Sequence, residues 1–557
     1  MVFLTSSRSS SRRRRPAAAA AVLALTALGL SAGVSTSMAA VPKATPPLLQ
    51  RNSSAVSGDA LPTAQVDGIV YKQVIVGNTV FAAGRFATAR PAGVAKGGAG
   101  TVARSGLMSY DIRTGKMTKF APKFTGGVEG APTELDALAL SPDKKILYVG
   151  GNFTAVNGKK RTFLASFTVS TGHLRPLSAT IKSQVRAIAT VGNTVYLGGY
   201  FKSINGTSRL YAGAVKASTG ALLAWNPKAN SSVEALLVNP GKDRVIIGGR
   251  FSTLGGHQAR GMGAVTTVAG SVRTWKANLK IQDYGSDSAI LDLTADKDTI
   301  YGAAYGYQAG NFEGVFAVST KVGSIKWLQD CHGDQYSVAP IGNYIYSVGH
   351  AHFCKNIGGF SEIAPQRAMV VTKAAHGTVA HNTQTDSDNY TDWAGYQAPS
   401  IVNWFPVLNT GSFSGSHQGA WSVRGTSKYV VLGGEFTTVN GQQQQGLVRF
   451  TTPGNGAPGK LGPVGSSNGM TPHVVTNNST GRTLAWLANY DRDDRDLTYK
   501  VLRDGKVVAT LVRASSFYHR PQLTWKDKSA KLGVGYHYQI FVQDQKNSVR
   551  SVQIYST

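Results

Sequence analysis

Seven copies of one eight-residue pattern constrain the fold of this chain more than any other feature. They read TVFAAGRF (79–86), ILYVGGNF (146–153), TVYLGGYF (194–201), RVIIGGRF (244–251), TIYGAAYG (299–306), YIYSVGHA (344–351) and YVVLGGEF (429–436). Each copy is rich in β-branched and aromatic residues, which is typical of a strand. An apolar run precedes each copy across a turn, a third run follows it, and a weaker fourth run usually comes next. The pattern therefore predicts seven units of four antiparallel strands.

Seven such units predict an all-β fold, a seven-bladed β-propeller over residues 62–451. One blade cannot bury both faces of its sheet, whereas a closed ring packs every face against a neighbour. A parallel β-helix is the alternative, but these units are too long for one coil. The paired glycines allow a close approach of neighbouring backbone or a bulge. The aromatic residue after them should lie in the core; the copies with the full GGxF pattern place it at Phe153, Phe201, Phe251 and Phe436.

The first forty residues resemble a targeting segment. A basic cluster, an apolar run and small residues follow one another, which predicts a secretory signal over 1–40 with cleavage near Ala39 or Ala40. A membrane anchor is disfavoured because the run is short and poor in large residues. The mature chain should carry no transmembrane segment, and we expect it to be extracellular or associated with the cell envelope. The export route stays open, and residues 41–61 are expected to form an N-terminal extension.

The C-terminal part has a different pattern. Residues 452–471 are rich in Gly and Pro and are expected to form a linker. Residues 472–557 alternate apolar and polar positions between turn signals, which predicts a β-sandwich. The acidic run DRDDRD (491–496) suggests calcium, but its interleaved arginines weaken that reading and favour an exposed turn whose charges pair with each other.

Two family resemblances fit this organisation. The GGxF copies, followed by Asn-Gly and Thr-Gly turns, resemble the delta-sixty-type propeller repeats of secreted actinobacterial proteins. The segments DRDDRDLTYKVLRDG and GVGYHYQIFVQD resemble a fibronectin type III module. Together the resemblances cover nearly the whole mature chain. They imply a fold and no particular activity, so they carry over no catalytic residue.

The fifth and sixth copies depart from GGxF, and both cysteines flank the sixth. Cys331 lies in the loop before the first strand of that unit, and Cys354 lies in the loop after the second strand. These loops share one face of a propeller, and export permits a disulfide between them. Two buried free thiols are the alternative.

Acidic and histidine residues gather around the same loops. The candidate ligand-binding set at this face is His332, Asp334, His350, His352, Glu313, Asp287 and His417, with Asp67 and Glu134 at the starts of other inner strands. Such a set could hold a divalent cation, perform acid/base chemistry or form a hydrogen-bonded network between loops. We expect the network, assign no catalytic residue and commit to no cofactor.

A long insertion, 381–420, separates the sixth and seventh copies. It is rich in aromatic residues, among which we select Trp393, Tyr396 and Trp404 as candidate ligand-binding residues. Exposed aromatic rings stack on sugars or anchor interfaces. The alternative is that they pack the insertion onto the propeller.

The charge balance suggests a class of partner. The whole chain carries a formal charge of +29, and removal of the signal takes away five arginines and no acid, leaving +24. Such a chain is attracted to polyanions, including anionic cell-wall polymers. The alternative is that the charge serves solubility. The sequence has no helix-turn-helix, zinc-finger or single-strand-binding signature, so we expect no specific nucleic-acid partner.

Two functions follow from these features. The first is a secreted binding or scaffold protein whose propeller face recognises an extracellular glycan, a cell-envelope polymer or a protein. The alternative is an extracellular enzyme acting on a polysaccharide or envelope polymer, with a His/Asp/Glu site where the fifth and sixth units meet the channel. We favour binding over catalysis.

Overall fold

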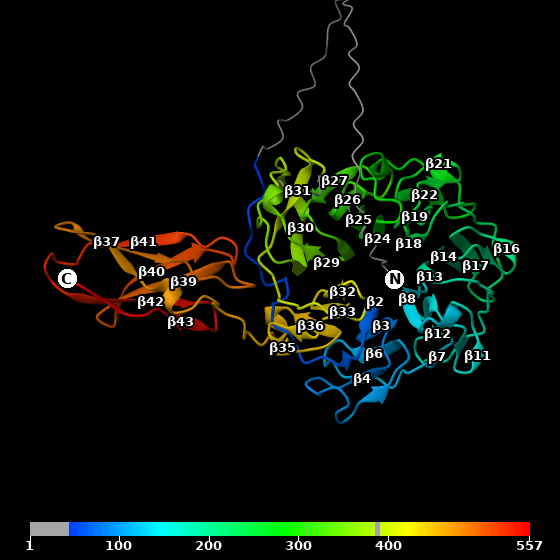
Figure 1. The fold of residues 1–557 in the computed structure, drawn as a ribbon, viewed down its shortest axis with the longest axis horizontal. Coiled ribbons are helices and arrows are strands. Elements are labelled where there is room, and N and C mark those ends of the chain that lie inside the picture. The colour runs from blue at the N-terminus through cyan, green and yellow to red at the C-terminus, as the bar shows by residue number, and fades with distance from the viewer. Residues whose placement is uncertain (1–43, 308, 385–389) are drawn as a thin grey trace, which may run out of the picture.

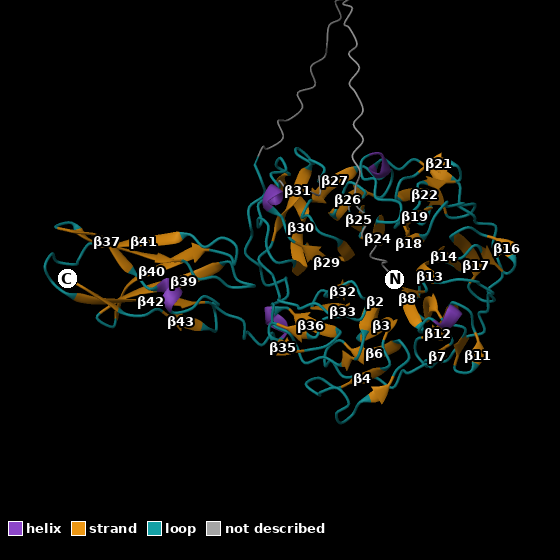
Figure 2. Ribbon diagram, in the orientation of Figure 1, coloured by secondary structure: helices purple, strands orange, loops and turns teal. Residues whose placement is uncertain are grey.

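The computed structural model describes residues 44–307, 309–384 and 390–557, and its regular structure is almost entirely β-strand (Figure 2). The only helices in these residues are five short 3₁₀ helices: η1 (Val128–Gly130), η2 (Ala277–Leu279), η3 (Lys355–Ile357), η4 (Pro453–Asn455) and η5 (Asn468–Met470). None of the helices in the described part of the chain is long and apolar enough to cross a membrane. The predicted signal segment, 1–40, lies outside the described residues.

Seven antiparallel sheets follow one another in the first four-fifths of the chain, and we number them blades 1 to 7. Their first strands are β2 (Ile69–Val76), β8 (Glu134–Leu140), β13 (Val185–Val191), β18 (Val233–Val238), β24 (Ser288–Ala295), β28 (Gln335–Ile341) and β32 (Ala420–Gly425). Their second strands are β3 (Thr79–Arg85), β9 (Ile146–Asn152), β14 (Thr194–Gly199), β19 (Arg244–Gly249), β25 (Thr299–Gly306), β29 (Tyr344–Ala351) and β33 (Tyr429–Gly434). Every repeated octapeptide of the sequence coincides with a second strand.

The third strands complete each sheet on its outer side. They are β6 (Leu107–Asp111), β12 (Leu164–Thr168), β17 (Ala212–Lys216), β22 (Met262–Thr266), β26 (Gly314–Ser319), β30 (Gln366–Thr378) and β36 (Leu447–Thr451). A fourth strand forms in blades 4, 5 and 6, as β23 (Val272–Arg273), β27 (Ile325–Gln329) and β31 (Gln397–Ile401). In blades 1 to 3 it is reduced to single bridges, such as Val215 with Leu222. The fourth strand is therefore weaker than the sequence suggested.

Short strands lie at the outer edge of the ring. They are β1 (Gln65–Val66), β4 (Thr88–Arg90), β5 (Val102–Ala103), β7 (Phe124–Thr125), β10 (Ala155–Val156), β11 (Lys159–Lys160), β15 (Ser203–Ile204), β16 (Thr207–Ser208), β20 (Thr253–Leu254), β21 (His257–Gln258), β34 (Thr438–Val439) and β35 (Gln442–Gln443).

The sheets close into a ring (Figure 1). Each first strand contacts the first strand of the next blade, and β2 of blade 1 contacts β32 of blade 7. The N-terminal segment joins this closure, because Leu61 forms an antiparallel bridge with Arg449 on the outer side of blade 7. The all-β propeller prediction is confirmed.

The glycine pair of the repeat has two separate packing roles, shown by blade 2. A Cβ on Gly150 would lie 2.6 Å from Cγ1 of Val185, which belongs to the first strand of blade 3. A Cβ on Gly151 would lie 2.2 Å from the carbonyl oxygen of Glu134 in its own blade. The first glycine therefore admits the neighbouring blade, and the second admits an irregular inner strand. The aromatic residues after the pair are buried as predicted: Phe153, Phe201, Phe251 and Phe436 are all 0% exposed.

The C-terminal strands form a β-sandwich beside the ring (Figure 1). One sheet contains β37 (His473–Asn478), β38 (Gly481–Leu487) and β41 (Gln522–Asp527). The other contains β39 (Asp496–Arg503), β40 (Lys506–Ala514), β42 (Tyr536–Gln543), β43 (Ser548–Arg550) and β44 (Ile554–Ser556). Trp486 from the first sheet packs with Tyr499 and Tyr538 from the second in one buried core.

The acidic run 491–496 corrects an expectation. Asp491 and Asp493 are 0% and 3% exposed, so the run is not an exposed turn, although Arg495 does pair with Asp496 within it. Other partners come from distant parts of the chain: Arg51 contacts Asp493 and Asp494, and Asn403 donates to the carbonyl of Asp491. The run therefore lies at the junction between the propeller and the sandwich.

Candidate functional site

A β-bulge recurs in the first strand of all seven blades. The register between first and second strands shifts by one residue near the start of each first strand, beginning with Val70/Lys72 in blade 1. The residues left over by these shifts, in blade order, are Tyr71, Asp136, Arg186, Glu234, Leu291, Tyr336 and Trp421. All seven line one small cavity of about 50 Å³. A bulge changes the direction in which a side chain points. Here the seven side chains, one from each blade, together surround the end of the channel. We call this set the bulge ring.

One side of the bulge ring is aromatic. Tyr336 of blade 6, Trp421 of blade 7 and Tyr71 of blade 1 come from consecutive blades. The rings of Tyr336 and Trp421 are stacked with centroids 4.3 Å apart, and Tyr71 meets Trp421 edge-on at 5.7 Å. The indole nitrogen of Trp421 donates to Oε1 of Glu435 at 3.2 Å, which fixes the orientation of the ring. Trp421 and Tyr71 are half-buried and Tyr336 is buried.

The opposite side of the bulge ring is charged. Arg186 of blade 3 donates to Asp136 of blade 2 at 2.6 Å and to Glu234 of blade 4 at 3.0 Å. Burial opposes ionisation of Glu234, but Arg186 and Arg250 outweigh burial and lower its pKa. Burial raises the pKa of Asp136, and the nearby Arg186 offsets only part of this rise. Three blades are thus joined by one guanidinium group.

A second charged layer closes the channel below the bulge ring. Asp292 of blade 5 accepts from Arg424 of blade 7 at 3.0 and 3.2 Å and lies 3.9 Å from Lys72 of blade 1. Burial alone would raise the pKa of Asp292, but Arg424 and Lys72 hold it at about 2. A cavity of about 170 Å³ lies between this layer and the Arg186–Glu234 pair. Since the cavity above is small, a large ligand would lie across the bulge ring rather than inside the channel.

The long insertion reaches the bulge ring. Ser414 and Ser416 line the same small cavity as Trp421 and Tyr336. Glu435 of blade 7 holds this part of the insertion by accepting from the amide and hydroxyl of Ser414, at 2.8 and 2.5 Å. The insertion therefore adds hydroxyl groups beside the aromatic side.

The predicted Asp/His cluster adjoins the bulge ring through Tyr336. The hydroxyl of Tyr336 donates to Oδ2 of Asp334 at 3.0 Å and lies 3.1 Å from Nδ1 of His350. Burial raises the pKa of Asp334 to about 7, and burial with Arg367 and His352 nearby lowers the pKa of His350 to about 3. Asp334 and His350 are 3.8 Å apart at their closest polar atoms. The structure thus brings these two predicted residues together.

The other residues of the set have separate partners. His352 pairs with Glu362 at 2.9 Å, and Glu313 accepts the amide of Gly333 at 2.8 Å. The imidazole of His332 is buried between Phe353 and Tyr390, with ring centroids 5.1 and 3.8 Å away. In the part of the chain that the structure describes, no group of three His, Cys, Asp or Glu ligand atoms at these histidines is close enough together to hold a metal ion. The arrangement resembles a network that joins loops.

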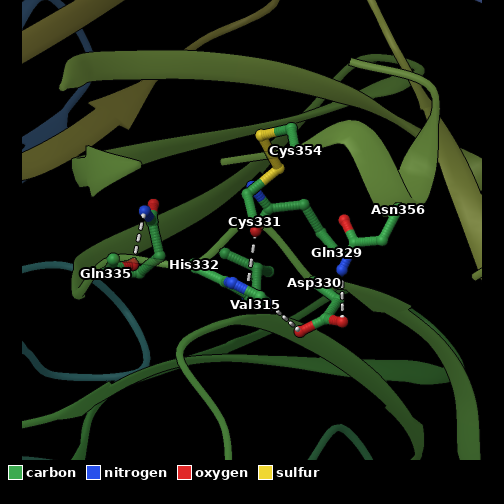
Figure 3. Close-up of a disulfide and its surroundings, with 9 residues drawn as sticks. Val315, Gln329, Asp330, Cys331, His332, Gln335, Cys354 and Asn356 are labelled. Atoms are coloured by element: carbon green, nitrogen blue, oxygen red, sulfur yellow. Dashed lines mark hydrogen bonds and ion pairs between the residues drawn. A yellow bond between two sulfur atoms is a disulfide. The ribbon is translucent and has the colours of Figure 1, made fainter. Parts of the chain in front are cut away.

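The predicted disulfide anchors this network. Cys331 and Cys354 are bonded, with Cα atoms 4.3 Å apart (Figure 3). Next to the bridge, Asn356 donates to Asp330 at 2.6 Å, and burial raises the pKa of Asp330. The prediction of a disulfide is confirmed.

Five candidate residues lie away from the bulge ring. Trp393 and Trp404 are only 4% and 0% exposed, so both follow the alternative in which the aromatic residues pack the insertion onto the propeller, and neither forms an exposed platform. Trp393 packs against Phe312 and Tyr396, and Trp404 against Tyr346 and Phe450, because the insertion fills the outer side of blades 5 to 7. Tyr396 is half-buried beside Trp393. Asp287 accepts from the hydroxyl of Ser286, and His417 is exposed with a φ of +53°.

Sequence reasoning missed most of the bulge ring. It named the strand starts, including Asp67 and Glu134, whereas the side chains that surround the channel are the leftover residues of the bulges. Glu134 lines the same cavity, but Asp67 instead accepts the amides of Ala87 and Thr88 at 2.9 and 2.8 Å. A charged residue inside an apolar run, as in LDALAL or VEALLV, was the available signal.

A comparison with protein-family models supports a propeller repeat in this chain. A family model described as a domain of unknown function (DUF5122) beta-propeller matches residues 429–456, which span β33 to η4. No curated protein matches the chain. The chain is similar to a solved structure of the computationally designed Ika8 protein, with 14% identity, a TM-score of 0.36 and coverage of 71% of this chain and 99% of that one. It is also similar to a chain of the Mitotic Checkpoint Complex, with 10% identity, a TM-score of 0.39 and coverage of 73% and 99%.

Proposed function

We propose that this chain is a secreted binding protein whose bulge ring and adjoining insertion bind an extracellular glycan or cell-envelope polymer. The observation that carries the proposal is the pairing of a stacked aromatic side with a charged side at one channel end. The half-buried faces of Trp421 and Tyr71 suit sugar rings, and nearby carboxylates, serines and Arg186 suit hydroxyl groups.

Several features support an extracellular location. The signal-like segment 1–40 suggests export, and a disulfide is typical of oxidising compartments. The resemblance of the C-terminal sandwich to a fibronectin type III module suggests a spacer or second binding unit. The charge of +24 on the mature chain favours an anionic cell-wall polymer as the surface to which the chain is attracted.

An enzyme that acts on such a polymer is a second candidate. It is favoured by Asp334, whose pKa of about 7 lets the carboxyl group carry a proton near neutral pH beside Tyr336 and His350. An acid/base role would need the polymer to reach this pair from the bulge ring. Release of reducing ends from the retained polymer, lost in Asp334→Asn, would favour catalysis over binding.

Retention on insoluble polymers tests the binding proposal. The mature chain would be incubated with purified bacterial cell wall and insoluble glycans over a salt titration, since salt screens adsorption by charge alone. We expect retention on one polymer at high salt, and about tenfold weaker retention for Trp421→Ala, the equivalent of about 1.4 kcal/mol. Tyr555→Ala is the matched control, because Tyr555 is an aromatic residue of the sandwich that is 62% exposed. Loss of all retention at moderate salt would contradict the proposal.

A further inference from the structure

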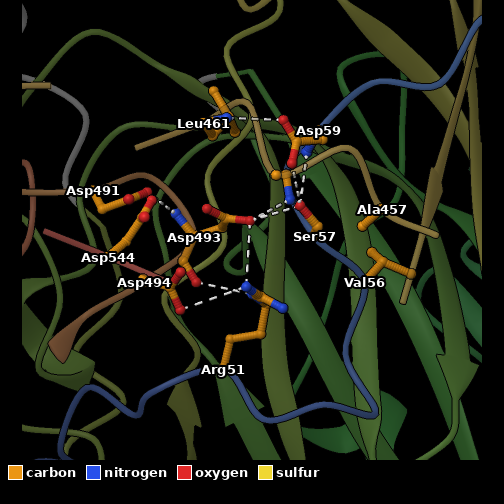
Figure 4. A network of polar contacts seen from close by, with 12 residues as sticks. Arg51, Val56, Ser57, Asp59, Ala457, Leu461, Asp491, Asp493, Asp494 and Asp544 are labelled. Carbon is orange, nitrogen blue, oxygen red and sulfur yellow. Dashed lines mark hydrogen bonds and ion pairs between the residues drawn. The ribbon is translucent and has the colours of Figure 1, made fainter. Parts of the chain in front are cut away.

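The junction between propeller and sandwich contains a group of carboxylates that the proposed binding function does not use (Figure 4). One carboxylate oxygen from each of Asp491, Asp494 and Asp544 lies within 4.8 Å of the other two. Asp491 and Asp494 precede β39, and Asp544 follows β42. The sandwich therefore gathers acids from two of its loops where it faces the propeller.

Asp491 is the most unusual member of this group. Its side chain is 0% exposed, its Oδ1 accepts the amide of Asp493 at 3.0 Å, and its Oδ2 has no hydrogen-bond partner in the described part of the chain. A buried carboxylate oxygen without a partner is costly. This oxygen is therefore open to a cation, since no hydrogen-bond donor of the described residues reaches it.

The basic groups of the junction contact oxygens other than Oδ2 of Asp491. Arg51 donates to the carbonyl of Asp493 at 2.9 Å and lies 3.5 Å from the carboxylates of Asp493 and Asp494. Arg495 forms two hydrogen bonds with Asp496, and Arg492 lies over the ring of Phe517 at 4.3 Å. The side chain of Lys546 reaches the carbonyls of Ala457 and Pro458. None of these contacts brings a basic side chain to Oδ2 of Asp491.

We propose that Asp491, Asp494 and Asp544 bind a calcium ion that fastens the sandwich to the propeller. Calcium–oxygen distances are about 2.4 Å, so oxygens that share one ion are at most about 4.8 Å apart, as these are. Three carboxylates from two loops form an irregular, all-oxygen set, which suits calcium better than the strict octahedron of magnesium. Water and second carboxylate oxygens would complete the coordination.

The ion would act on the joint because the same segment contacts the propeller. Asp494 accepts from Gln50 at 2.6 Å, Asn403 donates to the carbonyl of Asp491 at 3.2 Å, and the amide of Phe405 donates to the carbonyl of Arg492 at 2.8 Å. Fixing Asp491 and Asp494 on an ion would therefore hold the backbone that makes these contacts. The competing explanation is a proton on Asp491, which requires no metal.

Calorimetry on the full mature chain distinguishes the two explanations. After chelator treatment and its removal, calcium chloride is titrated at pH 7.5 and magnesium chloride is titrated in parallel. We expect saturable calcium binding at one site, at least tenfold tighter than magnesium, with a rise of several degrees in the unfolding temperature. Absence of calcium binding, or equal binding of magnesium, overturns the proposal.

Substitutions locate the ion. Asp544→Asn should weaken calcium binding at least tenfold and remove the calcium-dependent rise in unfolding temperature. Asp298→Asn is the matched control, because this carboxylate in blade 5 is 80% exposed and should leave both unchanged. If Asp544→Asn fails to fold, Asp491→Asn is used; calcium binding that survives in either folded variant overturns the assignment. Because the site lies outside the bulge ring, these results do not depend on polymer retention.

Discussion

Blades 2 to 4 and blades 5 to 7 of the propeller surround the channel with different kinds of residue. Blades 2 to 4 keep the full GGxF pattern and contribute Asp136, Arg186 and Glu234 to the bulge ring. Blades 5 to 7 include the two copies without the final phenylalanine, the disulfide and the long insertion, and they contribute Leu291, Tyr336 and Trp421. Blades 2 to 4 are thus joined by ion pairs across the channel, whereas blades 5 to 7 present aromatic rings and a half-buried Asp/His pair.

Breaking the ion pairs of blades 2 to 4 should have the largest effect on stability. Arg186→Met leaves Asp136 and Glu234 buried, each with a side chain only 3% exposed, and without their shared guanidinium. Loss of one member of a buried ion pair costs about 3–5 kcal/mol. Urea unfolding of the propeller should show this loss. The control Arg113→Met removes an arginine that is 57% exposed and should cost less than about 1 kcal/mol. Equal effects of the two variants would contradict the structural role of the charged side.

Removing the disulfide should have the next largest effect, confined to blades 5 to 7. The bridge closes a loop between residues 23 positions apart, so Cys331→Ser with Cys354→Ser should cost about 2–4 kcal/mol. Reductant should lower the unfolding temperature of the wild type and leave that of the double variant unchanged. A reductant effect on the double variant would show that the change lies outside the bridge.

A smaller effect should follow from the protonation of His350. Burial with Arg367 and His352 nearby lowers the pKa of His350 to about 3, below its usual value of about 6.5. Below pH 6.5 the unfolded state therefore binds more protons than the folded state, so the stabilising contribution present above that pH is lost as pH falls. Between pH 6.5 and pH 5 the wild type should lose about 1–2 kcal/mol more than His350→Gln in urea unfolding. Identical pH profiles would show that His350 is not buried as described.

The repeat could be predicted from the sequence because its signal is local and recurs. All seven octapeptides coincide with second strands, and the paired glycines mark places where a Cβ would meet another backbone or side chain. The disulfide was also predictable, because the topology places both loops on one face and both cysteines flank the same copy.

The bulge ring and the fate of the insertion were not predictable in the same way. A one-residue register shift decides which side chain faces the channel, and no local pattern reports that shift. Trp393 and Trp404 are buried by blades that lie far away in the sequence, so their aromatic character alone was misleading. The acidic run 491–496 was misjudged for the same reason, since Arg51 and Asn403 are distant along the chain.

Tryptophan fluorescence during titration with a soluble fragment of the retained polymer tests the central claim most directly. A ligand that lies across the bulge ring must contact Trp421, so binding should change the emission of the wild type. The change should disappear in Trp421→Phe and persist in Trp525→Phe, because Trp525 lies in β41 of the sandwich. A fluorescence change that persists in Trp421→Phe and disappears in Trp525→Phe would place the ligand on the sandwich and contradict the account.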